Sequence, residues 1–224
     1  MAVAVKAIAT EGRRNTAAGS ASYASVQVDR RVLRTRAALR HALVELIEER
    51  GFDGFTTSQL CERAGLNRGT FYNHCTGKED LITQFEDQII AEVEVFQAEM
   101  ADLSMPVIAL QVARKKPLPF LVSLFDYLRS EGDFLHAVLG PGGDPAFAPR
   151  LRESVCDNLV RITLHEKYRQ DPTAFVGYYV AFFASAYLGI ITRWIETGMR
   201  ESSQEMALVA QRLLFIKPGE SIEL

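Results

Sequence analysis

The most constraining feature of the sequence is a pair of closely spaced helix starts early in the chain. In FTTSQL, Thr56 is a candidate N-cap and Gln59 follows three residues later, which is the spacing of a capping box. Asn67 can cap a second helix that begins at Arg68, and Gly65 ends the first helix just before it. Two short helices joined by a glycine-containing turn form a helix-turn-helix motif.

The hydrophobic pattern of the rest of the chain predicts an all-α fold. Ahead of the motif, one helix is expected from near Asp29 to Arg50, with Gly51 in the usual place of a C-terminal cap. Its apolar stripe consists of Leu39, Leu43, Leu46 and Ile47. Further helices are expected near 78–101, 107–115, 119–130, 147–168, 172–198 and 203–216, and no useful length of sequence alternates in the manner of a strand.

Composition and charge divide the chain into three parts. Residues 1–29 lack a sustained period and are predicted to be a flexible arm, residues 30–78 form the helix-turn-helix domain, and residues 79–224 form a larger helical body. Residues 1–78 hold 12 Lys and Arg against 7 Asp and Glu, whereas the remainder holds 13 against 21. Such a split can arise by chance, but a basic front on an acidic body favours contact between the front and a polyanion.

The start of the second motif helix carries residues suited to reading DNA bases. The major groove, about 12 Å wide, admits an α-helix, and base contacts come mainly from the helix's first residues. Arg68 can donate to guanine O6 and N7, and Thr70 offers a hydroxyl and a methyl group to a base edge. Gly69 lets the backbone approach the base edges, because no side chain intervenes.

Polar residues around this helix are candidates for phosphate contacts. Tyr72, Asn73 and His74 follow at the end of the helix, where the groove wall turns toward the phosphates. Lys78 opens the next helix, and Thr56 opens the preceding one, although capping alone explains Thr56. Each of these residues taken alone also fits an ordinary surface or packing position. Their joint occurrence behind a basic helix favours DNA.

Residues 33–81 resemble the N-terminal domain of the TetR family of bacterial transcriptional regulators. The matching residues are Gly51-Phe52, Thr56, Ala64-Gly65-Leu66, Gly69-Thr70-Phe71-Tyr72, His74 and Lys78-Glu79-Asp80-Leu81. The resemblance implies a homodimer with one helix-turn-helix per subunit and an all-α C-terminal domain for dimerisation and ligand binding. It also implies base contacts near Arg68 and Gly69. The phosphate contacts that it implies come from Thr56, Asn67, Tyr72, His74 and Lys78.

Two residues of the helix-turn-helix domain depart from the family pattern. Cys75 stands where the family usually has Phe, and Cys61 where it usually has a small Ala, so both are expected to point inward. We expect Cys75 to loosen the domain, because it fills less apolar volume than Phe.

The second half of the chain gives a weaker resemblance. Residues 178–206 are similar to a branch of the family that includes regulators of dihydroxyacetone kinase operons, and some members of this branch act as coactivators.

The leading hypothesis is a cytoplasmic, ligand-responsive repressor that binds a palindromic double-stranded DNA operator as a homodimer. The dimer contact is expected from the helices near 172–198 and 203–216, the second of which opens with a Ser202…Glu205 capping box. A small-molecule effector is expected in the body. The candidate lining residues, each of which also fits plain core, are Phe120, Phe125, Tyr127, Tyr178, Phe182 and Trp194.

Three alternatives compete with this hypothesis. A protein-interaction module or coactivator could keep the fold without reading DNA. An enzyme would need a catalytic motif, but the chain has no P-loop, Rossmann glycine pattern, HExxH or Gly-x-Ser-x-Gly, and its histidines lack metal-ligand spacing, so no cofactor or metal is expected. The charge-free segment 172–192 is long enough to span a bilayer, but its tyrosines, glycines and serine favour a buried helix at an interface.

The cysteines bear on the compartment. There are three of them, widely spaced, and this pattern fits reduced thiols in a cytosol.

Overall fold

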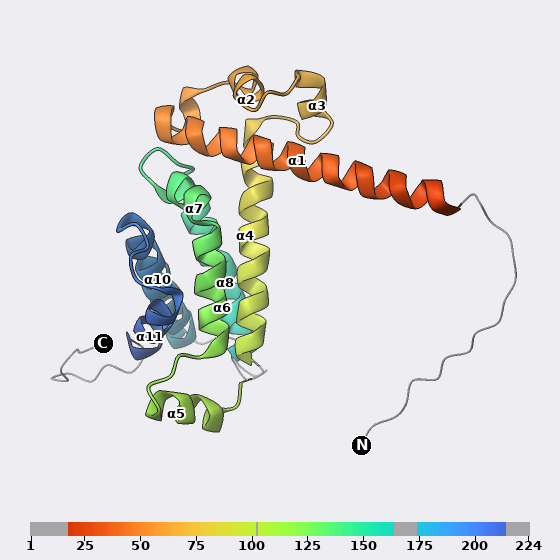
Figure 1. Cartoon of the computed structure of the whole chain (residues 1–224). Coiled ribbons are helices and arrows are strands. Elements are labelled where there is room, and N and C mark those ends of the chain that lie inside the picture. Colours follow the sequence, from red (N-terminus) through yellow and green to blue (C-terminus); the bar gives the residue numbers. More distant parts are fainter. Residues whose placement is uncertain (1–17, 102, 164–173, 214–224) are drawn as a thin grey trace, which may run out of the picture.

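The computed structural model of the chain describes residues 18–101, 103–163 and 174–213 (Figure 1). These residues form ten α-helices and one short 3-10 helix, and no strand occurs among them. The elements are α1 (Ala18–Arg50), η1 (Phe52–Gly54), α2 (Thr57–Arg63), α3 (Arg68–Tyr72), α4 (Lys78–Ala101), α5 (Met105–Ala113), α6 (Pro119–Ser130), α7 (Gly132–Leu139), α8 (Phe147–Thr163), α10 (Ala174–Glu196) and α11 (Ser203–Leu213). The predicted all-α fold is confirmed.

The helices form a small N-terminal unit on a larger body (Figure 1). Helices α2 and α3 lie against one side of α1, and α4 leads from this unit into the body. Within the body α4 packs against α6 and α8, α11 packs on α6, and α10 packs on α8. Helix α4 therefore connects the helix-turn-helix mechanically to the rest of the chain.

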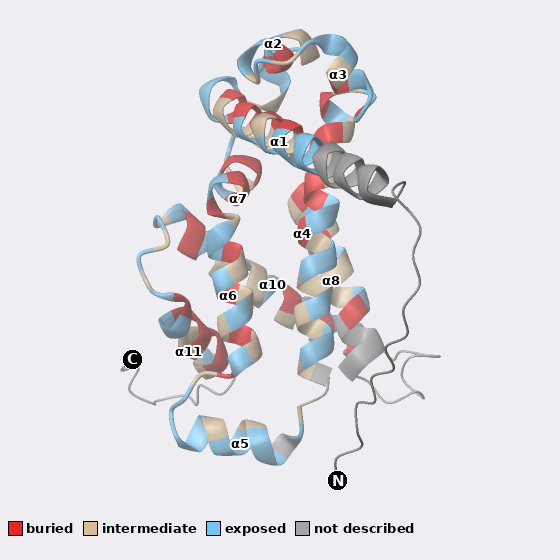
Figure 2. Cartoon of the chain, turned by 45° about the vertical axis from the view of Figure 1, so that its right-hand side comes forward, coloured by how far each residue is buried: buried red, intermediate tan, exposed pale blue. Residues whose placement is uncertain are grey.

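The core of the small unit follows the predicted stripe. Leu39, Leu43, Leu46 and Ile47 are all buried, and they meet Leu60 and Phe71, which are fully buried on α2 and α3. Cys61 and Cys75 also point inward, as expected from their positions in the motif. In Figure 2 the buried positions of α2 and α3 face α1, while their outer side is exposed.

The first helix begins earlier than predicted. Residues 18–29, for which the sequence predicts a flexible arm, belong to α1, and residues 1–17 lie outside the described part of the chain. The segment contains no proline, and its alanines favour helix. Because extending an existing helix avoids the cost of nucleation, a weak sequence can continue a helix that a strong one has started.

The sequence pattern does not predict one of the helices, and it misplaces some helix ends. Helix α7 was not predicted, because its eight residues are too few to show a helical period. Helix α5 begins and ends two residues before the predicted 107–115. Helix α10 falls within the predicted 172–198. The predicted extension of α8 beyond Thr163 and of α11 beyond Leu213 falls outside the described residues.

A buried carboxylate joins α4 to α8. Glu86 is fully buried; its Oε2 accepts a hydrogen bond from Arg150 Nη1 at 2.7 Å, while its Oε1 has no hydrogen-bond partner among the described residues. Arg150 also pairs with Asp87. Burial, and then the nearby Asp144 carboxylate, raise the pKa of Glu86 to about 7, although Arg150 acts in the opposite direction.

We predict that Glu86 makes the fold less stable as pH rises from about 5 to about 7. In this range the folded state holds a proton on Glu86 that the unfolded chain releases, so the free energy of unfolding decreases with pH. Glu86→Gln should remove this dependence and be more stable than wild type at pH 8 by roughly 1–3 kcal/mol, since one pKa unit is worth about 1.4 kcal/mol.

Urea unfolding at pH 5 and pH 8 measures both effects. Glu79→Gln is the matched control, because Glu79 is an exposed carboxylate on the same helix. A wild-type pH dependence that persists unchanged in Glu86→Gln would show that another group causes it.

Candidate nucleic-acid interface

Local hydrogen bonds fix the start of α2 and of α3. Thr56 Oγ1 accepts from the Gln59 backbone N–H at 3.3 Å, and Gln59 Oε1 accepts from the Thr56 N–H at 2.9 Å, so the predicted capping box is confirmed. Asn67 Oδ1 accepts from the Thr70 N–H at 2.7 Å and caps α3. Each cap satisfies a backbone donor that the first helical turn leaves unpaired.

The turn between the two helices is a Schellman motif. The Leu66 N–H donates to the Cys61 carbonyl at 2.9 Å, and the Gly65 N–H donates to the Glu62 carbonyl at 3.1 Å. Gly65 has a φ of 65°, which a residue without a Cβ adopts at little cost. This turn sets the angle at which α3 leaves α2.

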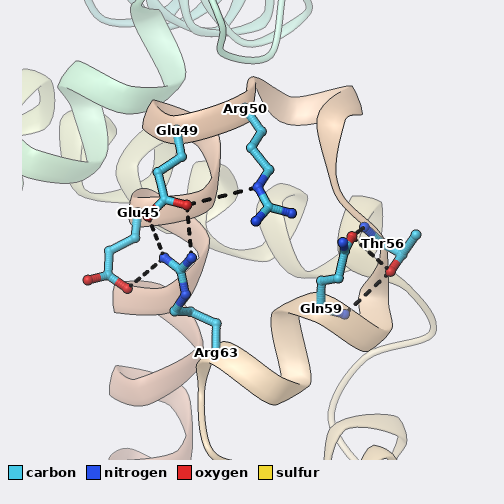
Figure 3. A network of polar contacts seen from close by, with 6 residues as sticks. All are labelled: Glu45, Glu49, Arg50, Thr56, Gln59 and Arg63. Carbon is cyan, nitrogen blue, oxygen red and sulfur yellow. Dashed lines mark hydrogen bonds and ion pairs between the residues drawn. The ribbon is translucent and has the colours of Figure 1, made fainter.

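An ion-pair cluster fastens α2 to the end of α1 (Figure 3). The Arg63 guanidinium donates two hydrogen bonds to the Glu49 carboxylate, both at 2.8 Å, and also pairs with Glu45 at 3.3 Å. The hydrogen bond from Arg63 holds the pKa of Glu49 below its usual value. Arg63 was not singled out from the sequence, because its partners lie on another helix.

The outer side of α3 presents most of the predicted base-reading residues. Arg68 and Gly69 are exposed, and Thr70 is partly buried. Beneath them Phe71 is fully buried in the same core cluster as the apolar stripe of α1. Neither a hydrogen bond nor an ion pair involves the Arg68 side chain among the described residues, which leaves its five donors available to a partner.

Gly69 is not required by the internal packing of the chain. An added Cβ at this position would meet only Asn67 Oδ1, at 3.4 Å, which is an ordinary contact distance. The φ angle of Gly69 is not in the left-handed region either. Because alanine would favour the helix more than glycine does, the structure provides no internal reason for glycine here. The bare backbone at Gly69 suits close approach of an external surface.

The predicted phosphate contacts are placed unequally. Tyr72 (57% exposed), Asn73 and His74 stand at the open end of α3, and the Tyr72 ring packs edge-on against Phe71. The Thr56 and Asn67 side chains are exposed while serving as caps. All five polar side chains therefore border the exposed face of α3 or the start of α2.

Lys78 differs from this group. Its side chain is buried, and Nζ donates to the Phe52 carbonyl at 2.6 Å and the Phe55 carbonyl at 2.8 Å. Nζ also lies 4.9 Å and 4.6 Å from the centroids of these two phenylalanine rings. In this conformation the Lys78 ammonium faces the interior of the unit and holds the segment before α2, instead of pointing to a phosphate. The sequence pattern does not reveal this role, because both acceptors are backbone atoms more than 20 residues away.

The six candidate effector-pocket residues are not brought together. Phe125 and Trp194 are core residues whose rings meet edge-on with centroids 5.3 Å apart, and Phe120 and Tyr127 are half-buried. Tyr178 and Phe182 point outward from α10 and are 78% and 67% exposed. The spacing of these aromatic residues predicts that they share one face of a helix. It does not distinguish a face buried in the core from a face that another molecule covers.

Two open cavities occur elsewhere among the described residues. One, of about 500 Å³, lies between α4 and α8 and is lined by Ile90, Glu94, Arg150, Glu153, Ser154, Asp157 and Asn158. The other, of about 430 Å³, lies between the end of α1 with η1 and the segment 138–148. None of the six predicted residues lines either cavity.

Two family models match the chain, one in each part. Residues 39–85 match the model described as bacterial regulatory proteins, tetR family, and residues 115–215 match one described as a transcriptional regulator C-terminal region of the TetR type. Among curated proteins, the chain is 37% identical over 68 residues to YxbF, an uncharacterized HTH-type transcriptional regulator of Bacillus subtilis (strain 168). That match covers 30% of this chain and 18% of YxbF, so the chain spans under a fifth of this relative.

Solved structures share the fold over most of the chain. The dihydroxyacetone kinase operon activator DhaS is 17% identical, with a TM-score of 0.51 over 80% of this chain and 93% of its own. FadR of Bacillus subtilis, solved with stearoyl-CoA, is 16% identical with a TM-score of 0.54 over 80% and 96%. A TetR-family regulator of Syntrophomonas wolfei reaches 0.58 at 12% identity over 80% and 92%. At these identities the likeness concerns the fold alone.

Proposed function

The chain belongs to the TetR family of bacterial transcriptional regulators, and from this membership we propose that it is a ligand-responsive repressor that binds a palindromic operator as a homodimer. The observation that carries the proposal is the outer side of α3. It combines an unpaired Arg68, a glycine that internal packing does not need, and a rim of exposed polar side chains.

Arg68 is the residue best placed to read sequence. It occupies the first position of α3, where the N-terminal end of a recognition helix meets base edges. A bidentate contact from arginine to guanine discriminates against a wrong base by about 1–3 kcal/mol. We assign the supporting phosphate contacts to the side chains of Thr56, Asn67, Tyr72, Asn73 and His74, which are all exposed.

Helix α10 is the proposed dimer contact. Its exposed aromatic residues are Phe175, Tyr178, Tyr179 and Phe182. On the same helix an added Cβ at Gly177 or Gly189 would meet no atom within 4 Å. A patch of this kind is rarely left exposed by a stable monomer, so we infer that a second copy covers it. Helix α11 packs against α6, and we propose that its exposed residues Gln204, Glu205 and Leu213 extend this contact.

The membrane alternative depends on the same helix. Phe175–Glu196 is long and apolar enough to cross a bilayer, with a mean hydropathy of 1.6, but one such helix is weak evidence. Val176, Val180 and Ala184 on α10 are buried, and α10 packs on α8. Since one side of the helix packs on α8, we propose that a protein partner covers its exposed face and that the protein is cytoplasmic.

The effector is proposed to act on the contact between α4 and α8. Ser154 Oγ donates to Glu94 Oε1 at 2.8 Å and Asn158 Nδ2 donates to Gln97 Oε1 at 2.7 Å, on or beside the larger cavity. A ligand that binds better to another α4–α8 arrangement would tilt α4 and with it α3. In a dimer this changes the spacing of the recognition helices, which DNA requires to be roughly 34–36 Å.

The charge of this cavity bears on the effector's chemistry. Three carboxylates, from Glu94, Glu153 and Asp157, and one guanidinium, from Arg150, line it. Because like charges repel, this lining disfavours an anionic acyl-CoA of the kind bound to FadR of Bacillus subtilis. A cationic or neutral polar molecule fits it better.

Selection of duplexes from a random DNA pool tests the proposed function. We predict that the wild-type dimer enriches a palindrome. Arg68→Ala should bind the palindrome more weakly or lose base preference at one position in each half-site. The discrimination free energy lost at that position should be about 1–3 kcal/mol. Arg152→Ala on α8, which also removes an exposed arginine, is the matched control and should enrich the same palindrome. If a verified wild-type dimer enriches no sequence, the protein-interaction alternative replaces this proposal.

Gly189→Arg tests the dimer contact. An arginine at this open position on α10 would bring two positive charges together across the proposed interface, one from each subunit. We therefore expect the dissociation constant of the dimer to increase at least about 100-fold. This corresponds to a loss of roughly 3 kcal/mol of association free energy. Analytical ultracentrifugation measures the change, with Ser123→Arg on the exposed side of α6 as the control. A Gly189→Arg protein that remains dimeric would place the interface elsewhere.

A further inference from the structure

Three exposed arginines lie on α1 ahead of the segment that packs in the core. They are Arg30, Arg31 and Arg34, here called the arginine patch. On a helix, residues three and four apart are surface neighbours, so these three side chains form one continuous group. No hydrogen bond or ion pair is found for any of them within the part of the chain that the structure describes.

The other described arginines of α1 and α2 are all engaged in hydrogen bonds or ion pairs. Arg36 donates to the side-chain oxygens of Gln84 and Gln88 on α4, at 3.1 and 3.0 Å. Arg40 pairs with Glu131 in the body, and Arg63 pairs with two carboxylates of α1. These pairings hold the unit together, whereas the arginine patch contributes no internal contact of this kind. Three adjacent, unpaired positive charges repel one another unless a polyanion lies close to them.

The helical period places the arginine patch on the side of α1 that faces α2. At about 100° per residue, all three positions fall within roughly 60° of the direction of Glu45 around the helix axis. Glu45 pairs with Arg63 of α2, which marks that side. At about 1.5 Å per residue, Arg34 and Arg30 lie roughly 16 and 22 Å along α1 from Glu45. Figure 1 shows α1 passing beside α2 and α3 and continuing beyond α3.

We propose that the arginine patch binds phosphates of the DNA that flanks the half-site contacted by α3, so that α1 extends the footprint of each subunit. This inference rests on the proposed DNA-binding function and adds a second contact surface to it. The occupant follows from charge complementarity and from continuity with the helix-turn-helix face. Such contacts carry no sequence information; they strengthen binding and make it more dependent on salt.

The test compares binding isotherms of full-length wild type and the triple variant Arg30→Gln, Arg31→Gln and Arg34→Gln over a range of salt concentrations. Glutamine keeps the helix propensity of arginine, and circular dichroism checks that α1 remains helical. The probe is the palindrome that wild type enriches from a random pool. It is made in two lengths, one ending at the outer edges of the half-sites and one longer by about ten base pairs, one helical turn, on each side.

A variant with the same change of charge far from α3 serves as the control. Arg114, Lys115 and Lys116 are exposed at the far end of the body, after α5. The control carries Arg114→Gln, Lys115→Asn and Lys116→Gln, with asparagine chosen because Lys115 has a φ of 51°. The control shows how much of any loss of DNA affinity comes from the lower net charge alone and how much from direct contacts of the arginine patch.

The slope is that of the logarithm of the DNA association constant against the logarithm of the salt concentration. We expect its magnitude to decrease by about 1 for each phosphate that the triple variant no longer neutralises. For a dimer, with three arginines in each subunit, the total decrease is up to about 5. Wild type and the control should prefer the longer duplex by at least about tenfold, and the triple variant should bind both lengths alike. An unchanged slope in the triple variant, or an equal decrease in the control, would overturn the inference. If wild type selects no DNA, the proposed function itself fails and this inference fails with it.

Discussion

The ammonium group of Lys78 fixes the junction between the helix-turn-helix motif and the helix that leads into the body. It sits at the first residue of α4 and donates to the carbonyl oxygens of Phe52 and Phe55, in the segment that leads into α2. Hydrogen bonds from a charged donor contribute about 1.5–3 kcal/mol each, and here the donor is buried. The start of the connecting helix and the start of the motif are therefore held together, so a tilt of α4 also moves α3.

A second set of contacts joins the motif to the body directly. The Phe52 N–H donates to the Gly142 carbonyl at 2.7 Å, and a Cβ at Gly142 would come within 3.2 Å of the Gly51 Cα. His136 lies 3.3 Å from Glu48, which adds a polar contact between α7 and α1. With two attachments, the small unit can follow a rearrangement of the body as a rigid piece, as the proposed ligand control would require.

The sequence was most informative where the physics is local. Caps at Thr56 and Asn67, the turn at Gly65 and the apolar stripe of α1 depend on residues a few positions apart, and the structure agrees with each prediction. The inward direction of Lys78 and the scatter of the six aromatic pocket candidates depend on which helices become neighbours. A helical period gives the face of a residue but does not say whether core, ligand or a second subunit covers that face.

An external partner explains the exposed side of α3 better than internal packing does, and Gly69→Ala tests this most directly. Urea unfolding and affinity for the selected duplex would be measured on the same protein. We predict a free energy of unfolding equal to wild type or higher by about 0.5–1 kcal/mol, since alanine favours the helix and its Cβ meets only ordinary contacts, together with clearly weaker DNA binding. Unchanged or tighter DNA binding by a folded variant would contradict this explanation.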